Sequence, residues 1–304
     1  MIKFSFNLMA VTFFTLWTSF TYGQGCSDAG FCTINSFKPN TTDSSRVADN
    51  QLKTGAFFGL ADNSISVYGN YLEYYRQISG KLGLDVKLTS LGQQGNGIST
   101  FGLSDIFVNA NYKLSERFKL TVGTKIPLSQ ANKKVNNLAL PMDYQASLGT
   151  TDLVFGLGFE IKKMQLVAAV QQPLTQNNNA FLSADYPVNS ELSKFQSTQQ
   201  FGRSGDILLR VSYPLNISHK LTLTPSILPI YHLTNDKFTD EFNEIKEIQG
   251  SQGLTLNGNA YLDYELNSKS NIQLNVGVPF IVRDSRPDGL TRSFIANLEY
   301  RVKF

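Results

Sequence analysis

The carboxyl-terminal stretch from Ser293 to Phe304 constrains the fold more than any other part of the chain. Its apolar residues are Phe294, Ala296, Leu298, Tyr300, Val302 and Phe304, and the positions between them include Asn297, Glu299, Arg301 and Lys303. The alternation has a period of two residues, which predicts a strand with one apolar and one charged face. A strand ending a soluble sandwich would alternate as well, but it would seldom stop at an aromatic carboxyl terminus with three charges opposite. We therefore expect the apolar face to meet lipid and the charged face to line a lumen.

Similar alternation recurs upstream and predicts twelve strands. The candidate segments are roughly 52–61, 65–78, 80–91, 101–114, 117–128, 150–161, 164–174, 204–214, 219–233, 253–266, 270–282 and 291–304. The first two are the least regular, because glycines and a cluster of tyrosines blur their phase.

The connections between these segments alternate in length. Tight turns are expected at Ser115–Glu116, Lys162–Lys163, Leu215–Ser218 and Asn267–Lys269, and long polar loops at 92–100, 129–149, 175–203 and 234–252. Outer-membrane barrels have short periplasmic turns and long extracellular loops, whereas a soluble Greek key has no reason to alternate strictly. The predicted fold class is all-β, a transmembrane antiparallel up-and-down β-barrel of about 12 strands over residues 52–304, with both termini in the periplasm.

Aromatic residues support this placement in a membrane. The following fall at the predicted periplasmic ends of strands: Tyr112, Phe118, Phe159, Tyr213, Tyr264 and Phe304. Amphipathic rings favour the membrane interface, so these residues predict an aromatic girdle in contact with outer-membrane lipid.

The amino terminus predicts export. Lys3 precedes an apolar run from Phe4 to Phe20, and small or turn-compatible residues follow up to Gly23, so we assign residues 1–23 as a signal peptide. A spanning anchor would need about 20 apolar residues, and polar residues interrupt this run. Lipidation at Cys26 is a lesser alternative, because Gly23 stands where a lipoprotein signal has a Leu-like residue.

Residues 24–51 are expected to form a periplasmic segment that folds against or into the barrel mouth. Five residues separate Cys26 from Cys32, the only cysteines, and an oxidising compartment predicts a local disulfide between them. No histidine lies nearby to complete a metal site, and we expect neither a metal nor a cofactor.

Composition excludes other classes of partner. The net charge of +3 is too small, and the basic residues too scattered, to predict nucleic-acid binding. The mean hydropathy of −0.16 matches a barrel in which half of each strand is polar.

The inward phase of the predicted strands carries both signs of charge. Its members are Lys81, Asp85, Lys87, Asp105, Asn109, Lys113, Lys119, Lys125, Asp152, Glu160, Asp206, Arg210, Lys220, Asp263, Glu265, Glu299 and Arg301. Facing walls of mixed charge can simply neutralise each other in hydrogen-bonded pairs. The functional alternative is a conduit whose constriction is set by such charges, with Lys125, Arg210 and Glu160 among the candidates for solute contacts.

A repeated phrase follows three of the long loops. It occurs as Gly102–Ile106, Gly149–Leu153 and, with one extra residue, Gly202–Ile207. In each copy a glycine allows the chain to change from loop to strand, and Asp105, Asp152 or Asp206 then points inward at a similar depth. These carboxylates could bind a polar solute or a cation, or they could pair with Lys125, Arg203 or Arg283.

At these phrases the chain resembles outer-membrane transporters related to phenol-degradation pathway proteins, whose strands often begin with Gly-x-x-Asp-Ile/Leu. The resemblance covers Leu52 to Phe304 and implies an outer-membrane barrel assigned to transport, without identifying a substrate. The last strand also resembles the C-terminal signal of bacterial outer-membrane barrels. That resemblance implies recognition by the barrel assembly machinery through Phe304, Val302, Tyr300 and Leu298.

The function expected is a channel or transporter for small solutes with a narrow, charged lumen. One alternative is a structural or adhesive barrel with a closed lumen. The other, an outer-membrane lipid hydrolase, would need a serine, a histidine and an amide on the outer wall. Only His219 and His232 are present, one beside a predicted periplasmic turn and the other with inward parity, so we expect no enzyme.

Deleting the final strand, or replacing Phe304, should block membrane assembly. An unclosed sheet edge in hydrocarbon leaves backbone groups without hydrogen bonds, which is costly. Heat-modifiable migration on gels would report assembly. Normal surface display of the truncated protein would contradict the prediction.

Overall fold

The computed structural model describes residues 34–39, 50–289 and 293–304. The predicted signal peptide and the predicted disulfide between Cys26 and Cys32 lie outside these residues. Within the described ranges, the helical segments are all too short and too polar to cross a membrane.

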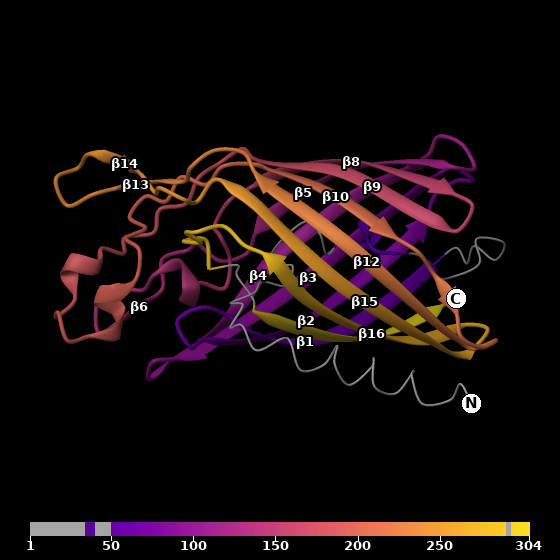
Figure 1. Ribbon diagram of the computed structural model, residues 1–304, viewed down its shortest axis with the longest axis horizontal. Coiled ribbons are helices and arrows are strands. Elements are labelled where there is room, and N and C mark those ends of the chain that lie inside the picture. Colours follow the sequence, from indigo (N-terminus) through magenta and orange to yellow (C-terminus); the bar gives the residue numbers. More distant parts are fainter. Residues whose placement is uncertain (1–33, 40–49, 290–292) are drawn as a thin grey trace, which may run out of the picture.

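Twelve long antiparallel strands form a closed barrel, as the sequence predicts (Figure 1). They are β1 (Asn50–Leu60), β2 (Ser66–Gln77), β3 (Leu82–Gly95), β4 (Ile98–Lys113), β5 (Phe118–Pro127), β8 (Asp152–Ile161), β9 (Met164–Pro173), β10 (Asp206–Ser212), β12 (Leu221–His232), β15 (Gly253–Asn267), β16 (Ser270–Ile281) and β17 (Phe294–Lys303). The short β11 (Leu215–Asn216) also pairs with β12. Neighbours in sequence are neighbours in the sheet, and β17 pairs with β1 to close it.

The two ends of the barrel differ. The "turn end" carries the short turns and the carboxyl terminus, and the "loop end" carries the long loops (Figure 1). The prediction of a long loop at residues 92–100 is wrong. These residues belong to β3 and β4, which continue to a two-residue turn at Asn96 and Gly97. Both turn residues have positive φ, 51° and 75°, which is the geometry that an Asn-Gly pair favours in a tight hairpin.

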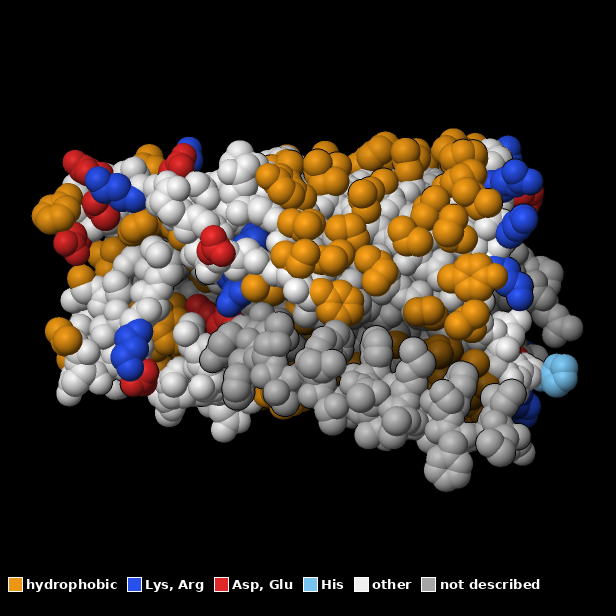
Figure 2. All heavy atoms as spheres, in the orientation of Figure 1, with side chains coloured by type: hydrophobic (Ala, Val, Ile, Leu, Met, Phe, Trp, Pro, Cys, Tyr) orange, Lys and Arg blue, Asp and Glu red, His pale blue; other side chains and the backbone are white. Residues whose placement is uncertain are grey.

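The outer wall of the barrel is apolar. Large exposed side chains cover it, while charged residues gather towards the two ends (Figure 2). Leu298 is 56% exposed and Tyr300 42%, in agreement with the predicted outward face of the last strand. At the turn end, the rings of Phe118 and Phe159 stack with their centroids 4.4 Å apart.

The long loops fold against the inner wall near the loop end. They contain the hairpins β6–β7 (Lys134–Val135, Leu138–Ala139) and β13–β14 (Lys237–Thr239, Ile245–Glu247) and the short helices η3 (Met142–Tyr144), η4 (Ser183–Asp185) and η5 (Glu191–Lys194). Leu140, Tyr144 and Phe181 from these loops are buried together with the inward-facing Phe57 and Leu91 of the barrel. An apolar cluster therefore joins these loops to β1 and β3 at the loop end.

Residues 34–39, called the luminal segment below, lie inside the barrel. The short helix η2 (Asn35–Phe37) forms half of this segment, and Ile34 and Phe37 are each only 1% exposed. Part of the predicted periplasmic lead-in thus occupies the lumen, and β1 begins at Asn50, just before the end of that predicted lead-in.

Candidate functional site

The lumen has a charged wall on β1–β3 and β15–β17. Lys53 Nζ lies 2.9 Å from a carboxylate oxygen of Glu73, and both side chains are almost fully buried. Glu299 pairs with Arg301, which in turn lies 3.7 Å from Asp263. A buried charge is costly unless it is paired, so these pairs keep a charged surface inside the barrel.

The opposite wall carries an apolar patch, called the apolar wall below. Its buried side chains come from β4, β8, β9, β10 and β12 and are Phe107, Val154, Ala169, Leu208 and Leu228. They pack with Ile34 and Phe37 of the luminal segment in one cluster. The lumen therefore has a charged surface opposite an apolar patch. Two residues away from that patch, the same strands turn buried charged side chains inward, such as Asp105, Asp206 and Arg210.

The luminal segment matches both surfaces. Phe37 fits against Gly156 of β8, where an added Cβ would lie only 2.3 Å from the Cε1 atom of the ring. Arg210 of β10, on the same side as the apolar wall, donates a hydrogen bond to the carbonyl oxygen of Phe37. On the other side, Lys38 Nζ lies 3.3 Å from Glu299. An apolar ring, a cation and a backbone acceptor thus hold the segment across the lumen.

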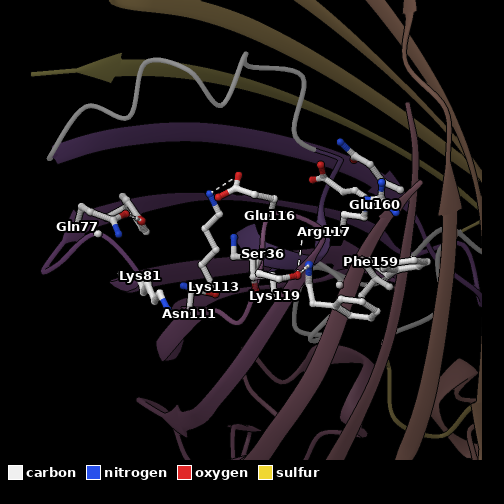
Figure 3. Close-up of a pocket in the computed structure, with 18 of the residues that line it drawn as sticks. Ser36, Gln77, Lys81, Asn111, Lys113, Glu116, Arg117, Lys119, Phe159 and Glu160 are labelled. Carbon is white, nitrogen blue, oxygen red and sulfur yellow. Dashed lines mark hydrogen bonds and ion pairs between the residues drawn. The ribbon is translucent and has the colours of Figure 1, made fainter. Parts of the chain in front are cut away.

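A cavity of about 750 Å³ opens at the turn end (Figure 3). Ser36 and Lys38 of the luminal segment line it, together with the turns that join β2 to β3 and β4 to β5. Its cationic side chains include Lys81, Lys113, Arg117 and Lys119, and its carboxylates include Glu116 and Glu160. Glu160, a predicted solute contact, therefore lies at this mouth, apart from the predicted aspartates.

Two of the predicted aspartates lie close to Lys125. Lys125 Nζ is 2.9 Å from Asp152 and also donates to the hydroxyl of Thr150, while Gln171 donates to Asp152. Asp105 accepts hydrogen bonds from the hydroxyls of Ser147 at 2.7 Å and Ser104 at 2.9 Å. Both carboxylates are fully buried, so they tie strands and a loop together instead of facing an open path.

Asp206, the third predicted aspartate, belongs to a charge network at the loop end. It pairs with Arg203, and its other oxygen lies 2.7 Å from His232 Nδ1. His232 Nε2 lies 2.8 Å from Asp236. Burial opposes the charge on Arg203, but Asp206 and Asp288 outweigh that effect and raise the pKa of the guanidinium above its ordinary value. Because carboxylates occupy both ring nitrogens of His232, neither nitrogen is placed to accept a proton from a serine nucleophile.

The sequence did not predict several residues of the site. Lys53 and Glu73 lie on the two strands whose alternation is blurred by glycines. Their inward direction becomes clear from the pairing of β1 with β2, in which Lys53 lies opposite Glu73. The apolar wall was missed because Phe107, Val154 and Leu208 sit inside continuous apolar runs, where alternation gives no signal. Nothing in the local sequence places Phe37 against Gly156.

Comparison with known proteins agrees with the fold. No protein-family model matches the chain, and no curated protein matches it. Among solved structures, an outer membrane channel from Pseudomonas putida F1 superimposes with a TM-score of 0.61 at 12% identity, over 88% of this chain and 99% of that chain. The barrel expected from the family resemblance is thus confirmed at the level of fold.

Two further structures give lower scores. The translocator domain of the autotransporter NalP from Neisseria meningitidis has a TM-score of 0.47 at 8% identity, over 86% of this chain and 90% of that chain. The NanC porin has a TM-score of 0.46 at 10% identity, over 84% of this chain and 98% of that chain.

Changing Asp105, Asp152 and Asp206 together to Asn should chiefly lower stability. Removing one partner of a buried ion pair costs about 3–5 kcal/mol. This variant leaves Lys125 without its carboxylate and Arg203 with the more distant Asp288, 3.8 Å away. We expect the temperature of the heat-modifiable gel shift to fall clearly. Glu160→Gln, at the exposed rim, is the control and should change it little. An unchanged transition in the triple variant would show that these pairs do not support the barrel.

Proposed function

We propose that the protein is an outer-membrane channel for small solutes, obstructed at rest by the luminal segment. The observation that carries this proposal is the position of residues 34–39 between a charged and an apolar wall. The segment adds no strand to the barrel sheet, so the ladder that closes β17 onto β1 does not depend on it. A piece that fills the lumen without being part of the wall can move while the barrel stays closed.

Polar side chains along part of the lumen favour a conduit. Among the described residues, the buried hydroxyl or amide atoms without a hydrogen-bond partner include those of Thr224, Ser226, Asn257, Asn259, Asn275 and Asn297. They form a strip across β12, β15, β16 and β17. Buried polar groups are normally satisfied, so this strip favours exchange of partners with water or a polar group on a solute over a permanently packed core.

The cavity at the turn end fits the same proposal. Ser36 and Lys38 line the inner end of this cavity but are only 9% and 8% exposed, so the segment ends the cavity and blocks the lumen beyond it. In this proposal the turn end faces the periplasm, the signal peptide directs export, and the barrel assembly machinery inserts the chain. A closed structural or adhesive barrel is the alternative.

The test is single-channel conductance in planar bilayers. The parent protein should conduct weakly or intermittently, and the double variant Phe37→Ala, Lys38→Gln should conduct several-fold more, because it loses both the apolar contact and the ion pair with Glu299. Lys246→Gln, in an exposed loop, is the control and should behave like the parent.

Silence of the double variant, with the barrel correctly assembled, would contradict the channel. Equal steady conductance of parent and double variant would support a pore and contradict obstruction by residues 34–39.

A further inference from the structure

Three lysines lie next to one another at the turn end of the barrel. Lys113 of β4 lies directly opposite Lys119 of β5, and Lys113 donates its backbone N–H to the carbonyl oxygen of Lys81. One inward position deeper on the same two strands, Thr121 donates its hydroxyl to the side chain of Asn111, so that pair is complementary. Like charges directly opposite each other destabilise a sheet, so stability of the sheet does not explain the pair of Lys113 with Lys119.

The carboxylates nearby leave most of this positive charge unpaired. Glu116 lies 2.8 Å from Lys113, but the Glu116 side chain is 89% exposed, so solvent screens this pair. Four further charged residues beside the lysine pair form no ion pair in the described part of the chain, namely Lys81, Arg117, Lys119 and Glu160. Two neighbouring turns, β2–β3 and β4–β5, therefore present a surplus of positive charge.

The turn-end cavity gives this charge a bounded space. Lys81, Lys113 and Lys119 all line its volume of about 750 Å³ (Figure 3). Pockets for small molecules commonly enclose about 300–1,000 Å³, so this volume suits one small solute. A cleft lined mainly by one sign of charge raises the local concentration of counter-ions. The cavity therefore favours a small anion.

The luminal segment adds a cation at the inner end of the cavity. Lys38 lines the cavity, and its Nζ lies 3.3 Å from Oε2 of Glu299. Cations thus lie both at the rim and at the inner end, a distribution that suits an anion with more than one charged group.

The pair between Lys38 and Glu299 can be exchanged. Tyr71 also donates a hydrogen bond to Oε2 of Glu299, and Arg301 donates one to Oε1. Glu299 therefore keeps two donors if Lys38 leaves it, so no buried carboxylate is left unpaired. The ammonium of Lys38 needs a new partner, which an anion in the cavity provides.

We infer that the turn-end cavity binds small anions that carry two or more carboxylate or phosphate groups, and that such an anion weakens the hold of the luminal segment by replacing Glu299 as the partner of Lys38. The inference rests on the proposed channel and adds its substrate class and the means of opening. A ligand shifts an equilibrium between two states only if it binds one of them better. An anion meets this condition, because its contact with Lys38 forms only when the pair with Glu299 is broken.

The first test is calorimetric titration of the purified protein with citrate in a zwitterionic detergent. The parent should bind citrate, with glucose as the uncharged probe that does not bind. The double variant Lys113→Gln, Lys119→Gln should bind it several-fold more weakly, and Lys113→Arg, Lys119→Arg should retain binding. Lys220→Gln with Lys269→Gln is the matched control, because it removes two cations from other turns of the same end that do not line the cavity.

Single-channel conductance provides the second test. Citrate added on the turn-end side at constant ionic strength should raise the open fraction of the parent several-fold, and glucose should not. The Lys113→Gln, Lys119→Gln variant should lose this response. The Phe37→Ala, Lys38→Gln variant should conduct without citrate and gain little from it, because the pair that citrate breaks is already absent.

The outcomes separate the inference from the channel itself. If the parent does not bind citrate, or if the matched control weakens binding as much as the lysine pair does, the cavity is not an anion site, although conductance can still support a channel. If citrate binds without raising the open fraction, it does not release the segment. A response to phosphatidylglycerol in the bilayer instead of citrate would assign these cations to lipid headgroups and overturn the inference. Silence of every variant would remove the channel, while calorimetry would still decide on the anion site.

Discussion

Closure of the backbone ladder is the constraint on which the rest of the structure depends. A strand that crosses hydrocarbon has no water to satisfy its N–H and C=O groups, so every strand needs a neighbour on each side. Here the last strand meets that need by pairing with the first, from Gln51 opposite Lys303 to Leu60 opposite Phe294. The closed ring forces alternate side chains outward and inward, and this places charge and apolar surface on opposite sides of the wall.

The inward side chains then have to satisfy one another in a narrow space. The charged wall does so through pairs such as Lys53 with Glu73, and the apolar wall by packing against Ile34 and Phe37. Because the luminal segment presents Phe37 to one wall and Lys38 to the other, its fit depends on an apolar patch that faces a charged surface.

Much of the fold could be predicted from the sequence because period-two alternation directly reports a wall with lipid on one side. All twelve long strands and the outward face of residues such as Leu298 followed from it. The extended β3–β4 hairpin did not, because Gly92, Gly95 and Gly102 hide the alternation, although the Asn96–Gly97 pair signals a tight turn.

The candidate site was less predictable. The charges of Asp152 and Asp206 indicated inward residues, but whether they pair or stay free depends on Lys125 and Arg203, which reach them only in the folded barrel. The luminal segment is separated from its contacts by most of the chain, so local pattern carries no information about it.

The central claim, that residues 34–39 sit across the lumen between the two walls, can be tested most directly by chemical accessibility. Lys38→Cys, in a chain with Cys26→Ser and Cys32→Ser, would be treated in proteoliposomes with a charged, membrane-impermeant thiol reagent. Lys246→Cys in an exposed loop would serve as the reference. The account predicts that Cys at position 38 reacts many-fold more slowly than the reference, and that adding Phe37→Ala brings its rate much closer to it. Reaction of the position-38 thiol as fast as the reference, with or without Phe37, would show that the segment does not occupy the lumen.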